Sequence, residues 1–409
     1  RCETKELKEG EIKSENIALP EDFDVPKSIL FKTTHTIAEV WLDGEKIYEY
    51  GNEADAPGFM KTPGSCWHIV DIPGDSSGKN LEVRIIPVYE GYYGNEVSLV
   101  YGTRGDCILK ILTDCLGILV ISCGILFAAV ICILLYCGAA RRKRSDKTEA
   151  KIEIFLNLGF FSLLVAVWTL VQCGFLQFLI PDGRTLYFVE YFSLFLFPVP
   201  FNFLLYDICK SRYHKGALIF SILYLTNMAV DVLLQCTGII DMSRLLSVIH
   251  VIMVANVVYT VVIILYEAGK KENDVAQKFR YPMCVVMGFG MAEMIFYYLR
   301  RFEQISILLS MGTMLFIIML IWIQVSQYYD QYIQKQKVIY LQKIANMDML
   351  TEAMNRNAYE DMVKYLDEGE IKLSTTGVVV FDLDDLKVIN DNFGHEKGDE
   401  ALKLCYQCI

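Results

Sequence analysis

The chain has 409 residues, of which 54% are hydrophobic, and its mean hydropathy is +0.33. Soluble domains are less apolar than this, so the composition favours a membrane protein with two or three domains. Acidic residues outnumber basic ones by 49 to 38, which gives a net charge of -11. A nucleic-acid-binding surface needs a basic patch, so the charge balance argues against that class of function.

Residues 1–106 show the alternation of β-strands. The segments AEVWL and EKIYEY flank Asp43 and Gly44, a pair that tolerates the positive φ angles of a tight hairpin turn. The segments WHIVDIP and NLEVRIIPVY repeat the pattern. We therefore predict a β-sandwich of the jelly-roll-like type. One disulfide among Cys2, Cys66 and Cys107 is compatible with this region and is not required by it.

Aromatic side chains are frequent in the same region, and most of them are expected in its core. The remainder would suit the surface of a site for a small-molecule ligand, such as a sugar. The residues in question are Trp41, Tyr48, Trp67, His68, Tyr89, Tyr92 and Tyr93.

Seven long apolar segments follow in residues 107–326. Each is close to the roughly 20 residues that a helix needs to cross a bilayer. A soluble helical core would need polar faces, which these segments lack. We predict a bundle of seven transmembrane helices, with spans at 108–137, 154–180, 186–209, 217–236, 245–266, 282–299 and 305–325.

The loops between these segments differ in charge. Those after the first, third and fifth segments hold thirteen lysines and arginines, and the alternate loops hold four. Because basic loops stay in the cytoplasm, we expect the N-terminus outside and the C-terminus inside the cell membrane.

Three acids lie within or near the apolar segments, where a charge is costly and marks a functional candidate. They are Glu190, Asp231 and Glu293. A transporter is one interpretation, but the sequence shows none of the inverted repeats typical of that class. These acids could instead face the bundle interior and take part in a switch.

Residues 327–347 predict a further helix that leaves the membrane. Apolar and long side chains recur at 4-3-4-3 spacing, which would let this helix pair with a second copy of the chain. An ordinary amphipathic linker explains the pattern equally well. The positions are Ile333, Lys337, Tyr340, Ile344 and Met347.

The segment 377–383, GVVVFDL, has the composition of a strand buried on both faces. Asp382, Asp384 and Asp385 stand at its end, where carboxylates commonly bind a divalent cation. An EF-hand is excluded, because counting from Asp382 its fifth and sixth positions are Leu386 and Lys387.

Two motifs at the C-terminus carry a resemblance. MDMLTEAMNR and FDLDDLKVINDNFGHEKGDEAL are similar to the first half of the GGDEF domain of diguanylate cyclases. That family joins two GTP molecules into cyclic di-GMP, using Mg²⁺ or Mn²⁺ and two facing domains. The resemblance implies a partial α/β domain over residues 348–409, GTP as substrate and a homodimer.

The resemblance also assigns roles to single residues. It makes Asp382 a metal ligand and places Asp385, Leu386 and Lys387 at the phosphates. Asn390 and Asp399 would bind the guanine edge, where a carboxylate can accept both N–H donors that guanine presents and adenine lacks. Structural roles are expected for His395, Asp391, Asp348 and Arg356.

This sequence departs from the family pattern in three ways. The basic-acidic motif for product inhibition, which many members carry, does not occur in the chain. Glu352 stands where a glycine is often found, and the GG[DE]EF loop with its second acidic ligand does not occur in the chain. We expect these 409 residues to be an inactive fragment of a longer enzyme. A receptor that only binds GTP or cyclic di-GMP is the alternative.

The wider layout resembles the bacterial seven-transmembrane receptors with diverse intracellular signalling modules. That likeness implies a sensor, with residues 1–106 outside the cell and the GGDEF segment in the cytoplasm.

Overall fold

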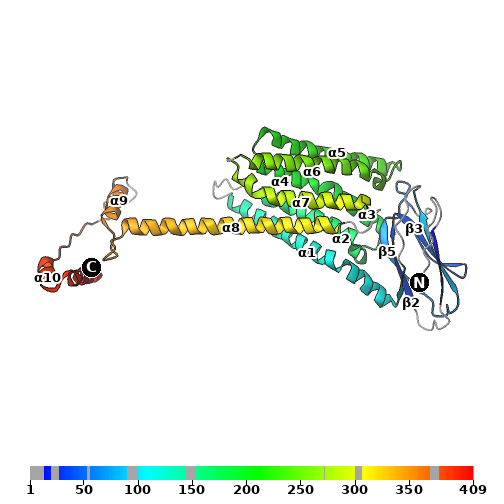
Figure 1. The fold of residues 1–409 in the computed structure, drawn as a ribbon, viewed down its shortest axis with the longest axis horizontal. Helices are drawn as coiled ribbons and strands as arrows, with labels where there is room; N and C mark the ends of the chain where they lie inside the picture. Colours follow the sequence, from blue (N-terminus) through cyan, green and yellow to red (C-terminus); the bar gives the residue numbers. More distant parts are fainter. Residues whose placement is uncertain are drawn as a thin grey trace. The chain divides into compact units, whose positions relative to one another are not determined.

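The computed structural model describes residues 13–19, 27–52, 56–89, 99–143, 153–270, 272–299, 306–368 and 377–408. The chain forms two compact units, Arg1–Ile321 and Trp322–Ile409 (Figure 1). Cys2, Tyr92 and Tyr93 lie outside the described residues. The first unit contains a β region and a helical bundle, and the second contains the segment that resembles a GGDEF domain.

The β region consists of two antiparallel sheets. One has the strand order β1-β6-β3-β4 and the other β5-β2-β7. Their apolar faces form one buried cluster, to which Phe31, Val40, Val70 and Val83 belong. The strands are β1 Lys13–Ala18, β2 Lys27–Thr34, β3 Thr36–Leu42, β4 Glu45–Tyr50, β5 Ser65–Ile72, β6 Asn80–Pro87 and β7 Val100–Gly102.

The predicted hairpin is confirmed. Strands β3 and β4 pair in antiparallel register, and the turn between them places Asp43 at φ 47° and Gly44 at φ 86°. Both angles are positive, as a two-residue turn between twisted strands requires. Strands β5 and β6 also occupy the two segments in which the sequence predicts them.

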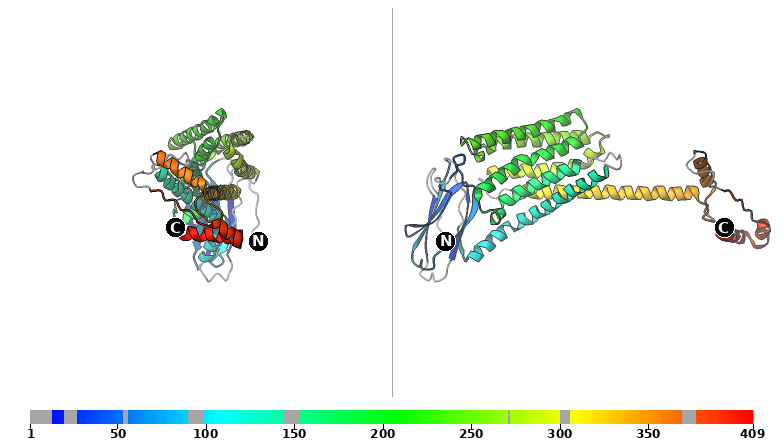
Figure 2. Two further views of the ribbon diagram at one scale, coloured as in Figure 1. Left: turned by 90° about the vertical axis from the view of Figure 1, so that its left-hand side faces the viewer. Right: turned by 180° about the vertical axis from the view of Figure 1, so that it is seen from behind.

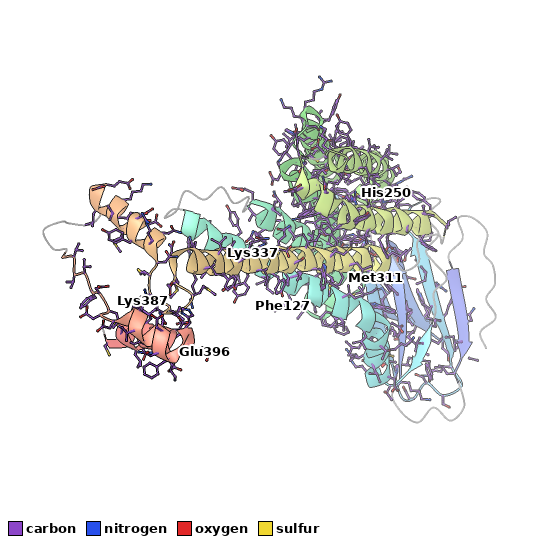
Figure 3. All side chains as sticks on the ribbon, turned by 60° about the vertical axis from the view of Figure 1, so that its left-hand side comes forward. Phe127, His250, Met311, Lys337, Lys387 and Glu396 are labelled. Carbon is purple, nitrogen blue, oxygen red and sulfur yellow. The ribbon has the colours of Figure 1, made fainter. Side chains whose placement is uncertain are left out.

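Within the described residues, the bundle contains seven helical spans that are long and apolar enough to cross a membrane, as a multi-pass membrane protein requires. They lie side by side in both views of Figure 2. Phe127, labelled in Figure 3, is 69% exposed in the single chain, which suits a side chain that faces lipid. Eight α-helices make up these seven spans, because α3 and α4 together form the third: α1 Arg104–Lys143, α2 Glu153–Gln172, α3 Gly183–Leu196, α4 Pro198–Ile208, α5 Lys215–Cys236, α6 Leu246–Ala268, α7 Asp274–Leu299 and α8 Ile307–Asn346.

The predicted span limits differ from the helices at three places. The second span ends at Gln172, and a short 3-10 helix, Phe175–Phe178, follows it. The third span is divided into α3 and α4 at Pro198, whose missing amide hydrogen is tolerated in the first turn of a helix. Pro282 does not begin a helix but lies inside α7.

The β region packs directly on one end of the bundle. Asp241, just before α6, accepts hydrogen bonds from the backbone N–H groups of Lys61, at 3.2 Å, and Thr62, at 3.3 Å, and from the hydroxyl of Tyr89. Gln177 exchanges two hydrogen bonds with the backbone of Trp67, at 2.7 and 2.6 Å. These bonds join loops and strand β5 of the β region to segments at the ends of the membrane helices.

Two glycines allow a close approach at this junction. A Cβ atom on Gly64, which has φ +87°, would lie 2.7 Å from the carbonyl carbon of Gly183. A Cβ atom on Gly183 would lie 2.9 Å from the carbonyl oxygen of Pro63. A larger residue at either position would therefore separate the β region from α3.

The second unit begins within α8 and continues with α9 Arg356–Asp367, α10 Leu386–Phe393 and α11 His395–Cys408. The predicted boundary between residues 326 and 327 falls inside α8, because the last membrane helix continues without a break to Asn346. The separate linker helix of the prediction is thus the C-terminal half of one helix.

The predicted strand at residues 377–383 is wrong for this structure. These residues form no strand, and Val380 and Phe381 are 87% and 62% exposed. A strand needs neighbours to pair its backbone groups. The described residues of the second unit contain no strand that could act as such a neighbour. The β pairing found there is one isolated bridge between Met347 and Met354.

Candidate functional site

The acidic segment leads directly into α10. Asp382 and Asp384 are accessible, and Asp385 caps the helix in the left-handed conformation, at φ 58°. Leu386 and Lys387 then form the first turn of α10. The first N–H groups of a helix lack partners within it and carry partial positive charge, so this turn suits a phosphate group.

Asn390 and Asp399 come from different helices that pack together, α10 and α11. The amide of Asn390 lies against Gly398, where an added Cβ atom would be only 2.9 Å from the amide carbon. Because residue 398 is glycine, the Asn390 amide can approach the backbone of α11 directly before Asp399. The packing of α10 on α11 therefore places Asn390 beside the residue that precedes Asp399, and the GGDEF resemblance assigns Asn390 and Asp399 to the guanine edge.

Lys387 and Glu396, labelled in Figure 3, mark the two helices of this site. Asp391 is exposed on α10, and His395 is exposed as the first residue of α11, directly after the turn at Gly394. Gly394 has φ +83°, which favours glycine. The turn between α10 and α11 therefore depends on Gly394 rather than on a hydrogen bond from His395.

Asp348 and Arg356 lie near the start of α9. Hydrogen bonds from the backbone and hydroxyl of Thr351 hold the pKa of Asp348 below its usual value. Arg356 pairs with Glu360 at 3.0 Å on the surface of the helix. Asn355 accepts a bond from the N–H of Ala358 and donates one to the carbonyl of Ala345, so it fixes α9 to the end of α8. Asp348 and Asn355 thus organise this connection.

The donor set of the acidic segment fits a hard divalent cation. Mg²⁺ is usually bound by one or two carboxylates together with substrate phosphates rather than by a cage of protein ligands. Asp382 offers one such accessible carboxylate close to the first turn of α10. Within the described residues no cluster of three or more metal-binding side chains is present.

The comparison with protein families decides the assignment of this segment. Residues 345–409 match the family described as "Diguanylate cyclase, GGDEF domain". This segment belongs to the GGDEF family. The GGDEF segment begins at the end of α8 and includes α9, α10 and α11.

Three curated proteins are similar to the GGDEF segment. They are the cyclic di-GMP phosphodiesterases NbdA of Pseudomonas aeruginosa, 37% identical over 70 residues, PdeR of Escherichia coli, 38% over 63, and PdeB of Shewanella oneidensis, 38% over 69. These matches cover 17%, 15% and 17% of this chain. They cover 9%, 9% and 8% of the relatives, so the chain matches less than a tenth of each relative's length. No solved structure matches the chain.

The structure places the three intramembrane acids in polar contacts. Glu190 on α3 accepts a hydrogen bond from the side chain of Gln172, at 2.6 Å. Asp231 accepts one from Asn227, one turn earlier on α5, at 2.8 Å. Glu293 on α7 accepts backbone hydrogen bonds from Ser306 and Leu309 at the start of α8.

The contact of Asp241 was missed in the sequence. It depends on a loop residue 180 positions away in the chain, and no local pattern indicates such a partner. The sequence left a disulfide among Cys2, Cys66 and Cys107 open, and in the structure Cys66 and Cys107 are free thiols.

Proposed function

We propose that this chain belongs to a bacterial membrane sensor of the diguanylate cyclase type, whose GGDEF domain converts two GTP molecules into cyclic di-GMP. The observation that carries the proposal is the GGDEF match at residues 345–409 in a chain with seven membrane-length helices. The matching segment contains the proposed metal, phosphate and guanine residues, which lie just before α10, on α10 and on α11. Their arrangement around α10 supports this assignment.

The chemistry assigns each residue one task. Asp382 would hold Mg²⁺ or Mn²⁺, which when bound neutralises charge on the phosphates and lowers the pKa of an attacking hydroxyl. The first turn of α10, with Lys387, would hold the phosphates in place. Asp399 would accept both guanine N–H donors, and Asn390 would donate to an acceptor of the same base.

The reaction needs two bound GTP molecules, so we propose that two copies of the chain meet. Supporting this, Ile333, Tyr340 and Ile344 lie on α8 and are 45%, 64% and 43% exposed in the single chain. Pairing of α8 with its counterpart would cover such apolar surface. A change in that pairing would alter the meeting of the two GTP sites and so carry the signal.

For orientation, we propose that the β region, as a β-sandwich, faces the outside. Lys210 and Lys270 lie near Glu267 at the end of α6, whereas the β region contacts the start of that helix through Asp241. Basic residues stay on the cytoplasmic side, which supports this direction. The β region would then be in a position to perceive an external small molecule.

A second candidate is a receptor whose GGDEF segment binds GTP or cyclic di-GMP without synthesis. The names of the three relatives favour it, because each is a cyclic di-GMP phosphodiesterase with a similar segment. Synthesis of cyclic di-GMP by the complete gene product would decide for the cyclase, and binding of either nucleotide without synthesis would decide for the receptor.

Base selectivity tests the proposed site directly. Calorimetric titration of the chain in nanodiscs with GTP and with ATP, both with Mg²⁺, should show at least tenfold tighter binding of GTP. Asp399→Asn should lose that preference, because one acceptor for guanine becomes a donor. Glu400→Gln is the matched control, since Glu400 pairs with Lys397 at 2.6 Å on the same helix. Equal affinity of the unmodified chain for GTP and ATP would contradict the assignment.

A further inference from the structure

A cavity of about 570 Å³ extends from the β region into the helical bundle. Its walls include Lys32 of β2, Trp67 of β5, Glu190 and Tyr191 of α3 and Glu293 of α7. Ligand pockets for small molecules commonly fall in the range of about 300–1,000 Å³. The size of the cavity therefore suits a small molecule rather than a protein segment.

Lys32 projects into this cavity. Its ammonium nitrogen lies 3.4 Å from the backbone oxygen of Gln172 and 5.6 Å from the centre of the Trp67 ring. Burial lowers the pKa of the Lys32 amine, although its side chain keeps accessible surface on the cavity. An ammonium group has three N–H donors, so one long hydrogen bond leaves it able to bind an anionic group.

Glu190 faces the same space with the opposite charge. One carboxylate oxygen accepts the hydrogen bond from Gln172, at 2.6 Å, and the second oxygen retains its capacity to accept. Gln172 thus contacts both charged residues, through its backbone and its side chain. Within the part of the chain that the structure describes, no ion pair joins Lys32 to Glu190. The two groups interact electrostatically without forming a direct ion pair.

From this arrangement we infer that the cavity binds a small zwitterion that has an apolar group, the chemistry of a free amino acid. The carboxylate of the ligand would pair with Lys32 and its ammonium group with Glu190. Trp67 and Tyr191 supply aromatic surface for the apolar group. The inference depends on the proposed function in one respect, that the bound zwitterion acts as the signal. It then names the class of ligand that the sensor detects.

The two charges also account for selectivity. A simple carboxylate would pair with Lys32 and leave Glu190 without a partner in the ligand, and a simple amine would pair with Glu190 and leave Lys32 without one. A ligand with one charge therefore gains one of the two ion pairs, so it should bind more weakly than a zwitterion.

The cavity also reaches the start of α8. Glu293, which lines it, binds the backbone of Ser306 at 2.8 Å and of Leu309 at 2.9 Å. A ligand in the cavity would therefore lie beside Glu293, the residue that fixes the first turn of α8. Binding would stabilise one position of this helix start, which is the change that a sensor requires.

Three probes test the inference on the full chain in nanodiscs by calorimetric titration. L-phenylalanine carries both charges, 3-phenylpropanoate only the carboxylate and phenethylamine only the ammonium group. We expect L-phenylalanine to bind at least tenfold more tightly than either analogue. This comparison uses the unmodified chain, so it does not depend on the folding of a variant or on nucleotide binding by the GGDEF segment.

Charge-removing variants then assign the two contacts. Lys32→Met should weaken the binding of L-phenylalanine at least tenfold and should not weaken phenethylamine. Glu190→Gln should weaken L-phenylalanine at least tenfold and should not weaken 3-phenylpropanoate. Lys27→Met and Glu272→Gln, outside the cavity, should bind like the unmodified chain. Equal affinity for all three probes, or no binding of L-phenylalanine, would overturn the inference. Failure of GTP binding would contradict the proposed function and leave the cavity assignment intact.

Discussion

The carboxylate of Glu293 accepts a hydrogen bond from the backbone N–H of Leu309, at 2.9 Å, across two different helices. Its other oxygen accepts the N–H of Ser306, at 2.8 Å. The first N–H groups of a helix need such acceptors, and here an acid from α7 supplies them for α8. This contact fixes the start of the helix whose other end reaches the GGDEF segment.

Removal of this cap should loosen the start of α8. Glu293→Ala leaves two buried N–H groups without acceptors, which should cost about 2 kcal/mol in the free energy of unfolding. Hydrogen exchange at residues 306–310, measured by mass spectrometry in nanodiscs, should become faster than in the unmodified chain. Glu272→Ala is the control, because Glu272 is exposed just before α7. Unchanged exchange at residues 306–310 in Glu293→Ala would show that the cap does not hold the helix.

Glu352 occupies a position that favours glycine. Its φ is 57°, in the left-handed region, and the sequence pattern of the GGDEF family often has glycine there. Left-handed backbone costs a residue with a Cβ about 1–2 kcal/mol, and most of all a β-branched one. Glu352→Gly should therefore be thermally more stable than the unmodified chain, and Glu352→Val should be less stable than both. Greater stability of Glu352→Val than of Glu352→Gly would contradict the backbone conformation of this turn.

His68 makes the β region sensitive to acid. Its ring nitrogens lie 2.7 Å from the hydroxyl of Thr33 and 2.9 Å from that of Tyr48, and burial lowers its pKa to about 3. The unfolded chain takes up the proton near pH 6.5, so it binds more protons than the folded chain between pH 6.5 and 3. The stability of the β region is therefore lost as the pH falls below 6.5. From pH 7 to 5 the loss should be about 2 kcal/mol for this residue alone.

Urea unfolding followed by the fluorescence of Trp41 and Trp67 measures this loss, in a chain with Trp168 and Trp322 replaced by phenylalanine. His68→Gln should reduce the difference in stability between pH 7 and pH 5, because the glutamine side chain does not titrate. His395→Gln, which changes an exposed histidine of the second unit, should leave that difference as it is. An undiminished difference in His68→Gln would assign the acid sensitivity to another group.

Local signals in the sequence predicted part of the fold. The Asp43-Gly44 hairpin depends on two residues and their flanking alternation, and it is confirmed. The apolar lengths predicted seven membrane helices, because span length depends on bilayer thickness alone. Helix limits were less predictable where a proline is tolerated inside a helix, as Pro282 is in α7.

Tertiary contacts explain what the sequence did not predict. The segment 377–383 has the composition of a strand, but a strand also needs neighbours, and composition does not supply them. For the GGDEF site, the motif assigns roles to residues by resemblance, and the structure adds that glycine at position 398 allows the close approach of Asn390. The cavity with Lys32 and Glu190 joins residues 158 positions apart, and a single sequence shows no sign of it.

Synthesis of cyclic di-GMP from GTP and Mg²⁺ by the complete gene product tests the central claim most directly. Asp382→Ala should lower the rate at least a hundredfold, because the metal ligand is lost. Asp384→Ala, two residues further in the same exposed segment, should keep most of the activity. Undiminished synthesis in Asp382→Ala would contradict the metal assignment, and absence of synthesis by the unmodified protein would contradict the cyclase itself.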